Sequence, residues 1–186
     1  MTEQDAASHW AIRGADSAAP SDQEQLVIAL FDESRTALLR YLFSLGLPLQ
    51  DAEEVIQEVF LALFEHLKKR KPARNLRGWI FRVAHNLGLK RRLESRREVS
   101  SHELDHLVSV RPDPAANPEE QLAANQQHQR LQAVLQGMPE RDRWCLALRA
   151  EGLRYREIAE TLDLSLGSVA DSLARSLARL SRAGAD

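Results

Sequence analysis

Residues 138–180 decide the fold of the C-terminal part of the chain, and they read MPERDRWCLALRAEGLRYREIAETLDLSLGSVADSLARSLARL. Apolar residues recur in this stretch at helical spacing, which predicts three short helices. These helices are expected over residues 140–151, 154–162 and 166–181. Because only residues 163–165 separate the last two, the pair has the form of a helix-turn-helix. An ordinary helical hairpin would show the same pattern, so the pattern alone leaves DNA binding open.

Individual residues support this turn. Asp163 stands where the turn often needs a left-handed backbone, which Asp adopts at some cost. Ser165 can cap the following helix, and Ala159 is small where a second helix must cross closely. The other apolar residues expected between the two helices are Ile158, Leu162, Val169 and Leu173.

A long helix and a linker precede this unit. Asn117, Pro118 and Glu120 combine an N-cap, a first-turn proline and a capping-box acid, which together predict a helix start. That helix is expected to end at Gly137, because a proline follows two residues later. Residues 98–116 are acidic, contain two prolines and show no sustained period, so we expect a flexible acidic linker.

Two further helices are predicted near the N-terminus. Ser21 and Glu24 form a capping box that opens a helix ending at Gly46. Asp51, with Glu54 three residues later, is expected to open the next helix in the same way. Its apolar residues recur at helical spacing and predict a broad buried stripe of Val55, Ile56, Val59, Phe60, Leu63, Phe64 and Leu67.

A basic loop over residues 68–74 leads into a third helix. Asn75 can cap this helix. Trp79 lies beside apolar neighbours, and we expect it to belong to the core. The predicted inner face consists of Leu76, Ile80, Val83 and Leu87.

The pattern is helical throughout, and no stretch alternates in the manner of a strand. We therefore expect an all-α protein with two small helical domains joined by a flexible acidic linker, the second containing the helix-turn-helix. The expected divisions are a disordered tail over 1–21, a first domain over 22–97, the linker over 98–116, a second domain over 117–182 and a tail over 183–186.

The net charge of −2 conceals a segregation of charge. Residues 26–97 hold 14 basic and 8 acidic side chains, whereas residues 98–129 hold 1 basic and 6 acidic ones. A basic block of this kind indicates a polyanionic partner. No apolar run approaches the roughly 18 residues that cross a membrane, and the N-terminus lacks the basic start of a signal peptide. The single cysteine, Cys145, excludes an intrachain disulfide, so we expect a buried thiol in a cytoplasmic protein.

Both halves of the chain resemble the small two-domain sigma factors of bacterial RNA polymerase, the extracytoplasmic-function (ECF) subfamily of the sigma-70 family. Residues 51–60 (DAEEVIQEVF) resemble the family's polymerase-binding segment. Residues 75–93 (NLRGWIFRVAHNLGLKRRL) resemble the segment that reads and melts the −10 promoter element. In the domain that reads the −35 element, the positions at family spacing are Gly152, Leu153, Tyr155, Glu157, Ile158, Ala159, Gly167, Ser168 and Val169.

The resemblance implies a sigma factor that binds core RNA polymerase and directs promoter recognition and transcription initiation. Such a protein is not an enzyme and needs no cofactor or metal. Its partners would be promoter DNA and two parts of the polymerase, the clamp coiled coil of the largest subunit and the flap of the second-largest subunit. An anti-sigma factor is a common further partner in the family. The polymerase-binding residues that the resemblance implies are Asp51, Glu54, Gln57 and Glu58, on the polar face opposite the apolar stripe.

The third helix and the loop before it carry the cations expected for phosphates. By resemblance, the loop holds an unstacked base of the single strand. Asn86 matches the family asparagine near the exposed promoter strand, and its amide can both donate to and accept from a base edge. The −10 residues implied are Lys68, Lys69, Arg70, Lys71, Arg74, Arg77, Arg82, Asn86, Lys90 and Arg91.

The recognition helix departs from the family pattern. Sigma factors usually carry basic residues just after its start, where this chain has Ala170, Asp171 and Ser172. An acidic side chain facing phosphates repels them, so we expect weak or unusual −35 recognition. The −35 residues implied are Arg154, Arg156, Ser165, Ser168, Ser172, Arg175 and Arg179.

Two other functions compete with this interpretation. A stand-alone helix-turn-helix regulator would use the C-terminal unit alone, but the acidic face after Asp51 and the basic block argue against it. His102, Glu103 and His106 spell the HExxH pattern of zinc proteases. The pattern lies in the acidic linker without an obvious third ligand, so we expect no catalytic metal there.

Overall fold

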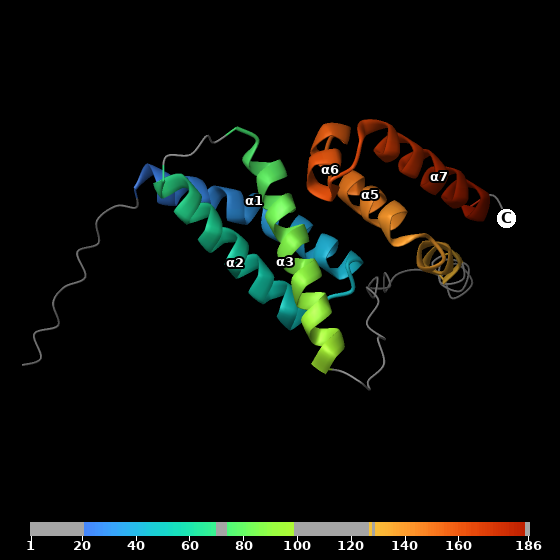
Figure 1. Ribbon diagram of the computed structural model, residues 1–186, viewed down its shortest axis with the longest axis horizontal. Helices are drawn as coiled ribbons and strands as arrows, with labels where there is room; N and C mark the ends of the chain where they lie inside the picture. Colours follow the sequence, from blue (N-terminus) through green and yellow to red (C-terminus); the bar gives the residue numbers. More distant parts are fainter. Residues whose placement is uncertain (1–20, 70–73, 99–126, 128, 185–186) are drawn as a thin grey trace, which may run out of the picture.

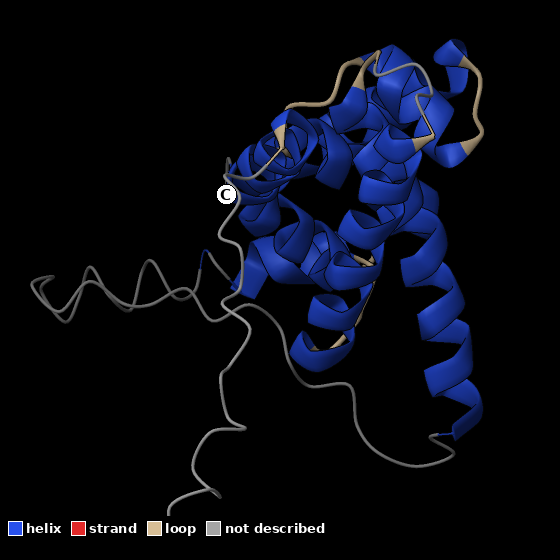
Figure 2. Ribbon diagram, turned by 90° about the vertical axis from the view of Figure 1, so that its left-hand side faces the viewer, coloured by secondary structure: helices blue, strands red, loops and turns tan. Residues whose placement is uncertain are grey.

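The computed structural model describes residues 21–69, 74–98, 127 and 129–184. Within these ranges all regular structure is helical, and Figure 2 shows helices and loops without a strand. The all-α class expected from the periodicity is therefore confirmed. The predicted linker, the helix start at Asn117 and the HExxH pattern at His102 lie outside the described residues.

The first helix, α1 (Asp22–Ser44), begins at the predicted capping box. The Glu24 N–H donates to the Ser21 hydroxyl at 3.3 Å, and the Ser21 N–H donates to the Glu24 carboxylate at 2.7 Å. The helix ends at Ser44, and Gly46 follows the C-cap residue Leu45 with φ of +88°, in the left-handed region that a glycine adopts without strain. Both ends of α1 thus follow from local sequence signals.

The second helix, α2 (Leu49–Lys68), begins two residues before the predicted capping residue. Its N-cap is Pro48, which provides no side-chain hydrogen bond, so the capping box expected from Asp51 and Glu54 is wrong. A proline with extended backbone can precede a helix without a side-chain cap, and Asp51 then lies inside the first turn. The predicted apolar stripe is buried except for Phe64, which is half-buried.

The third helix, α3 (Leu76–Glu98), follows the predicted cap. Asn75 has φ of +54°, and its side-chain oxygen accepts the N–H of Gly78 at 3.1 Å. Trp79 is half-buried, with its ring centroid 4.9 Å from that of His66.

The buried face of α3 differs from the predicted face. Ile80 is fully buried, but the other three predicted residues are only half-buried. The inner positions that the pattern did not identify are Phe81, Ala84 and His85. They are buried because α3 packs against α1 and α2 on one side and against C-terminal helices on another.

The C-terminal part begins with a helical segment over residues 129–136 that ends at Gly137, as predicted. Three helices follow: α5 (Glu140–Ala150), α6 (Tyr155–Leu162) and α7 (Leu166–Gly184). Cys145 is buried and free, as expected. The predicted packing residues Ile158, Ala159, Val169 and Leu173 are buried, while Leu162 is half-buried.

The two groups of helices are in contact. In Figure 1, α1, α2 and α3 lie together, and α5 and α6 lie beside α3. Their buried side chains form one continuous cluster. At the junction, the ring of Trp144 from α5 meets His85 of α3 edge-on, with 5.3 Å between the ring centroids.

Candidate nucleic-acid and polymerase interface

The exposed face of α2 presents two of the four residues expected to bind polymerase. Gln57 and Glu58 are both exposed. Leu61 lies one helical turn further along and is 62% exposed, so an apolar side chain adjoins this polar pair. The exposed face therefore combines a carboxylate, an amide and an isobutyl group, which suits docking of another helix better than solvation alone.

The other two residues of that set, Asp51 and Glu54, are engaged inside the molecule. Nε of Arg91 lies 3.3 Å from the Asp51 carboxylate, and the same guanidinium pairs with Glu54. Ser95 also donates to Asp51 at 3.1 Å. These carboxylates hold α3 against α2, and Arg91, which was expected to contact DNA, faces them.

The −10 candidates fall into two sets: one set is bonded to oxygens of other helices, and the other is exposed and includes the intrahelical pairs Lys69–Glu65 and Lys90–Glu94. Asn86 is exposed on α3, and the side chain of Lys90, four residues later, is 72% exposed. The other exposed members are Lys68, Lys69 and Arg74, at the ends of the loop between α2 and α3. Arg70 and Lys71 lie outside the described residues.

Two arginines of α3 bind oxygens of the C-terminal helices. Nη2 of Arg82 lies 3.0 Å from the Glu160 carboxylate of α6. Nη2 of Arg77 donates to the main-chain carbonyl of Glu151 at 2.6 Å. These two −10 candidates are therefore already hydrogen-bonded across the junction between the two groups of helices.

The turn between α6 and α7 has the local geometry predicted for it. Asp163 adopts φ of 53° and ψ of 50°, the left-handed conformation that the turn requires. Ser165 caps α7, because its hydroxyl accepts the N–H of Ser168 at 3.1 Å. Glu157 closes the start of α6 by accepting the Arg154 N–H at 2.6 Å.

The predicted recognition helix, α7, places Ser172 in the interior, which contradicts the expected DNA contact. Ser172 is fully buried, and its hydroxyl accepts from Arg175 at 3.2 Å. The reason is helical spacing, since Ser172 follows the buried Val169 by three residues and precedes the buried Ser176 by four. A side chain on that face points towards α5 and away from a ligand.

Arg175 is also engaged within the domain. Its Nη2 and Nε donate to the two carboxylate oxygens of Asp142 at 2.9 and 3.2 Å. This bidentate pair holds the pKa of the buried Asp142 carboxyl below its usual range. Arg175 was expected to contact DNA, and here it fixes α7 on α5 instead.

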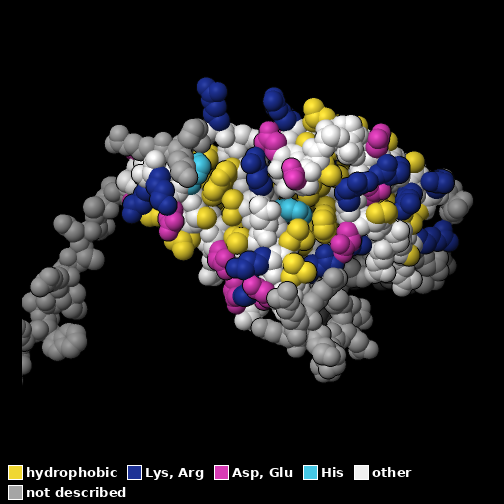
Figure 3. Space-filling model, in the orientation of Figure 1, with side chains coloured by type: hydrophobic (Ala, Val, Ile, Leu, Met, Phe, Trp, Pro, Cys, Tyr) yellow, Lys and Arg dark blue, Asp and Glu magenta, His cyan; other side chains and the backbone are white. Residues whose placement is uncertain are grey.

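The remaining −35 candidates lie at the surface. Arg154, Arg156 and Ser165 are exposed, and Ser168 is half-buried. Arg179 is half-buried, and its Nη1 donates to the Gly137 carbonyl at 3.5 Å. Asp171 is exposed beside them, so the negative charge noted in the sequence does project from α7. Figure 3 shows basic and acidic side chains interleaved across one face of the molecule.

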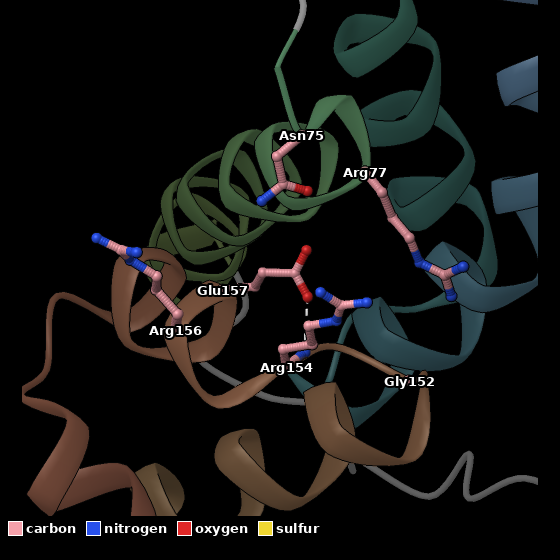
Figure 4. Close-up of a pocket in the computed structure, with 6 residues that line it drawn as sticks. All are labelled: Asn75, Arg77, Gly152, Arg154, Arg156 and Glu157. Carbon is pink, nitrogen blue, oxygen red and sulfur yellow. Dashed lines mark hydrogen bonds between the residues drawn. The ribbon is translucent and has the colours of Figure 1, made fainter.

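A cavity of about 580 Å³ lies where α3 begins and α6 begins. It is lined by Asn75, Arg77, Gly152, Arg154, Arg156 and Glu157. In Figure 4, Arg156 is directed away from the centre, whereas the Glu157 carboxylate projects into it towards Asn75. Because both groups of helices contribute to its walls, the cavity exists only while they remain together.

Two classes of feature are not found in the described part of the chain. No helix there is long and apolar enough to cross a membrane. No group of three or more His, Cys, Asp or Glu side chains in the described ranges is placed to hold a metal ion.

Comparison with known families decides the identity. Residues 30–98 match the family described as Sigma-70 region 2, and residues 128–180 match Sigma-70 region 4. The sigma factor CnrH of Cupriavidus metallidurans is 30% identical over 154 residues, which cover 78% of this chain and 79% of CnrH. The chain belongs to the sigma-70 family.

Other relatives of this sigma factor are ECF sigma factors. SigE of Mycolicibacterium smegmatis is 33% identical over 129 residues, 67% of this chain and 48% of that protein, so the match spans about half of SigE. The sigma-E factor of Escherichia coli K12 is 25% identical over 141 residues, which cover 72% of this chain and 74% of that protein.

Solved structures share the fold. CnrH in complex with the cytosolic domain of CnrY gives a TM-score of 0.58 at 24% identity, over 85% of this chain and 86% of that one. RpoE in complex with the anti-sigma factor NepR from Bartonella quintana gives a TM-score of 0.60 at 20% sequence identity, over 83% of this chain and 96% of that one. Both are sigma factors bound to another protein.

Several structurally important residues of this sigma factor carry no sequence signal. The side chain of Glu151 is only 9% exposed. Its carboxylate accepts hydrogen bonds from Nε and Nη2 of Arg40, at 2.8 and 2.6 Å. This hydrogen bonding raises the pKa of Arg40. The two residues are 111 positions apart, and neither lies in a motif, so only the tertiary packing identifies the pair.

Proposed function

We propose that this sigma-70 family protein joins core RNA polymerase, directs it to promoters and helps to open the DNA. The observation that carries the proposal is the presence of both family regions in order on one chain. Their candidate surfaces also differ in chemistry. The polymerase face on α2 is polar and acidic with one exposed leucine, whereas the face around Asn86 and Lys90 is amide and basic.

In this proposal, α2 docks on polymerase through Gln57, Glu58 and Leu61. Asp51 and Glu54 then have a positioning role, because they hold α3 through Arg91. The expected contact is the clamp coiled coil of the largest polymerase subunit, and the C-terminal domain is expected to meet the flap. The protein would catalyse no reaction itself and would act in the cytoplasm with the polymerase.

Promoter opening is proposed to depend on α3. Asn86 is exposed and can pair with the edge of an unstacked base. Lys90, with Lys68, Lys69 and Arg74 at the adjoining loop, supplies cations for the backbone. Recognition of the −35 element by α7 is expected to be weak, because Ser172 is buried, Arg175 is paired with Asp142 and Asp171 is exposed.

An anti-sigma factor is a further proposed partner. The support is that the two structural neighbours were solved as complexes, one with CnrY and one with the anti-sigma factor NepR. Such a partner would compete with polymerase for the α2 face or keep the DNA-binding faces covered.

Reconstituted transcription tests the proposal. Purified protein, core RNA polymerase and fragmented genomic DNA from the host should together yield discrete transcript starts that neither protein produces alone. A stand-alone regulator would instead bind specific fragments without polymerase and would not associate with core enzyme. Failure to bind core polymerase at low ionic strength, with no inhibitor present, would refute the sigma-factor assignment.

A further inference from the structure

A row of exposed side chains follows one face of α3. Asn86 is exposed, and the side chain of Lys90, four residues later, is 72% exposed. Leu93 follows Lys90 by three residues and is 60% exposed. Side chains three and four positions apart on a helix are neighbours, so these three residues share one face. The row therefore ends in an apolar side chain, next to the amide and the amine that are proposed to meet DNA.

Contacts on the opposite side of α3 fix the direction of Leu93. Arg91 pairs with Asp51 and Glu54 of α2. The Ser95 hydroxyl donates to Asp51 at 3.1 Å. Leu93 is two residues away from Arg91 and from Ser95, which places it on nearly the opposite side of a helix with about 3.6 residues per turn. The contacts that hold α3 on α2 therefore turn Leu93 outward.

The surroundings of Leu93 distinguish it from an ordinary surface leucine. Single exposed leucines are common on folded proteins and need no special explanation. Leu93, however, lies on the face of α3 that a polyanion would approach. The carboxylate of its neighbour Glu94 is offset by Lys90, since the Lys90 amine lies 4.0 Å away. When DNA covers this face, the isobutyl group leaves water, which is favourable if an apolar part of the DNA lies against it.

The thymine methyl group is the apolar feature by which DNA distinguishes one base from another. It projects into the major groove of the duplex, and the groove is wide enough to admit an α-helix. Apolar side chains contact this methyl group in protein–DNA complexes. Deoxyribose is also partly apolar, but every nucleotide carries it. An exposed leucine on a DNA-binding helix therefore suits recognition of thymine.

The position of Leu93 along α3 indicates which part of the promoter it meets. The loop before α3 and Asn86 are proposed to hold the unwound strand, and Leu93 lies beyond Asn86 on the side away from that loop. Leu93 follows Asn86 by 7 residues, which corresponds to about 10 Å along the helix. Because stacked bases are about 3.4 Å apart, a helix that runs along the groove carries Leu93 roughly three base pairs further. At that distance from the loop, we expect the two DNA strands still to be paired.

We infer that Leu93 is a specificity-determining residue, and that it recognises the 5-methyl group of a thymine in the paired DNA next to the melted segment. This inference rests on the proposed function and names one base that α3 prefers. Lys90 attracts the phosphates whatever the sequence, whereas Leu93 adds a preference among bases. Burial of one methyl-sized group corresponds to about a fourfold gain in affinity.

Selection from a promoter library tests the inference. The DNA would be a promoter obtained from the reconstituted transcription described above, randomised in the paired segment next to the melted bases. Holoenzyme containing the full-length chain should enrich thymine at one position on the side away from the loop. Leu93→Ala should lose this enrichment and keep the other sequence preferences. The matched control is Leu177→Ala, which shortens a leucine of α7 that is 56% exposed and should keep the enrichment.

Replacement of the enriched thymine by uracil isolates the methyl group. Uracil pairs with adenine as thymine does, so only the methyl group is lost. The substitution should weaken promoter binding by the wild-type holoenzyme about fourfold and leave binding by the Leu93→Ala holoenzyme unchanged. Leu93→Met keeps an apolar side chain of similar size and should retain most of the sensitivity to uracil.

Several results would overturn the inference. It is wrong if the wild-type holoenzyme enriches no thymine in this segment, or if uracil weakens the wild type and Leu93→Ala equally. It is also wrong if Leu93→Ala loses affinity for core polymerase in the absence of DNA, because the leucine would then dock on protein. A wild-type chain that forms no holoenzyme would refute the sigma-factor role instead, so the two failures are distinguishable.

Discussion

The hydroxyl of Tyr41 and Nδ1 of His85 lie 2.7 Å apart in the interior, where α1, α3 and α5 meet. Both side chains are buried, and burial raises the pKa of Tyr41 and lowers that of His85 to about 4. His85 is therefore neutral in the folded protein at pH 7. A neutral imidazole can share a hydrogen bond with the phenol and still pack against Trp144.

The buried Tyr41–His85 pair predicts that the folded protein loses stability as the pH falls. Unfolded His85 would titrate near 6.5, above its folded pKa of about 4, so between these values the unfolded chain binds more protons. Its contribution to stability is complete above pH 6.5 and is lost progressively as the pH falls towards 4. At pH 4.5 the expected loss is roughly 2–3 kcal/mol relative to pH 7. Urea unfolding at a series of pH values would measure it, and His85→Gln should flatten this part of the profile.

The division of the acidic residues on α2 predicts different effects on polymerase binding. Gln57→Ala/Glu58→Ala should weaken binding to core polymerase on the order of tenfold or more, because these side chains are exposed and free to dock. Glu54→Gln should act mainly through the position of α3, because Glu54 pairs with Arg91. Its effect should therefore be larger on DNA melting than on polymerase affinity. Equal loss of polymerase affinity in both variants would contradict this division.

Asn86 is predicted to act after polymerase has bound. Asn86→Ala should reduce open-complex formation by roughly one to two orders of magnitude if a base-edge contact worth about 1–3 kcal/mol is lost. Polymerase affinity should change little, because the residue lies on α3 and away from the α2 face. Permanganate footprinting of melted thymines and a polymerase binding assay would measure the two steps. Asn86→Gln, which keeps the amide, should retain part of the activity.

Substitutions at two neighbouring positions of α7 are expected to have opposite effects, one on stability and the other on DNA affinity. Ser172→Arg should destabilise the C-terminal domain by about 1–3 kcal/mol or more, because it forces a long charged side chain into a filled interior. Asp171→Arg should leave stability nearly unchanged and increase the affinity for duplex promoter DNA, with a steeper dependence on salt. Urea midpoints and DNA titrations at several salt concentrations would distinguish the two. Stable folding of Ser172→Arg would show that this side chain can turn outward.

The cap of α3 makes a further prediction about stability. Asn75 combines a positive φ with a hydrogen bond to Gly78, and alanine supplies neither property. Asn75→Ala should lower the free energy of unfolding by roughly 1–2 kcal/mol. Asn75→Gly should lower it by only about a few tenths of a kcal/mol, because glycine adopts this backbone conformation without strain. Thermal unfolding of the two variants under identical conditions would compare them. A larger loss for glycine would contradict the proposed role of the backbone conformation.

Local signals in the sequence were sufficient to predict the helices and where most of them begin and end. The capping box at Ser21, the cap at Asn75 and the left-handed turn at Asp163 each depend on a few adjacent residues. The start of α2 could not be predicted in this way, because Pro48 begins the helix without a side-chain hydrogen bond. Family resemblance then located the candidate surfaces, although it could not show which side chains were available.

The sequence by itself determined an all-helical chain and the short turn between α6 and α7, since helical periodicity and caps are encoded within a turn or two of the residues concerned. Tertiary structure alone decided that Ser172 is interior and that Arg82 is paired with Glu160, 78 residues away. The physical reason is that an ion pair depends on which faces of separate helices meet. No repeat or motif within either helix specifies which face packs against the other helix.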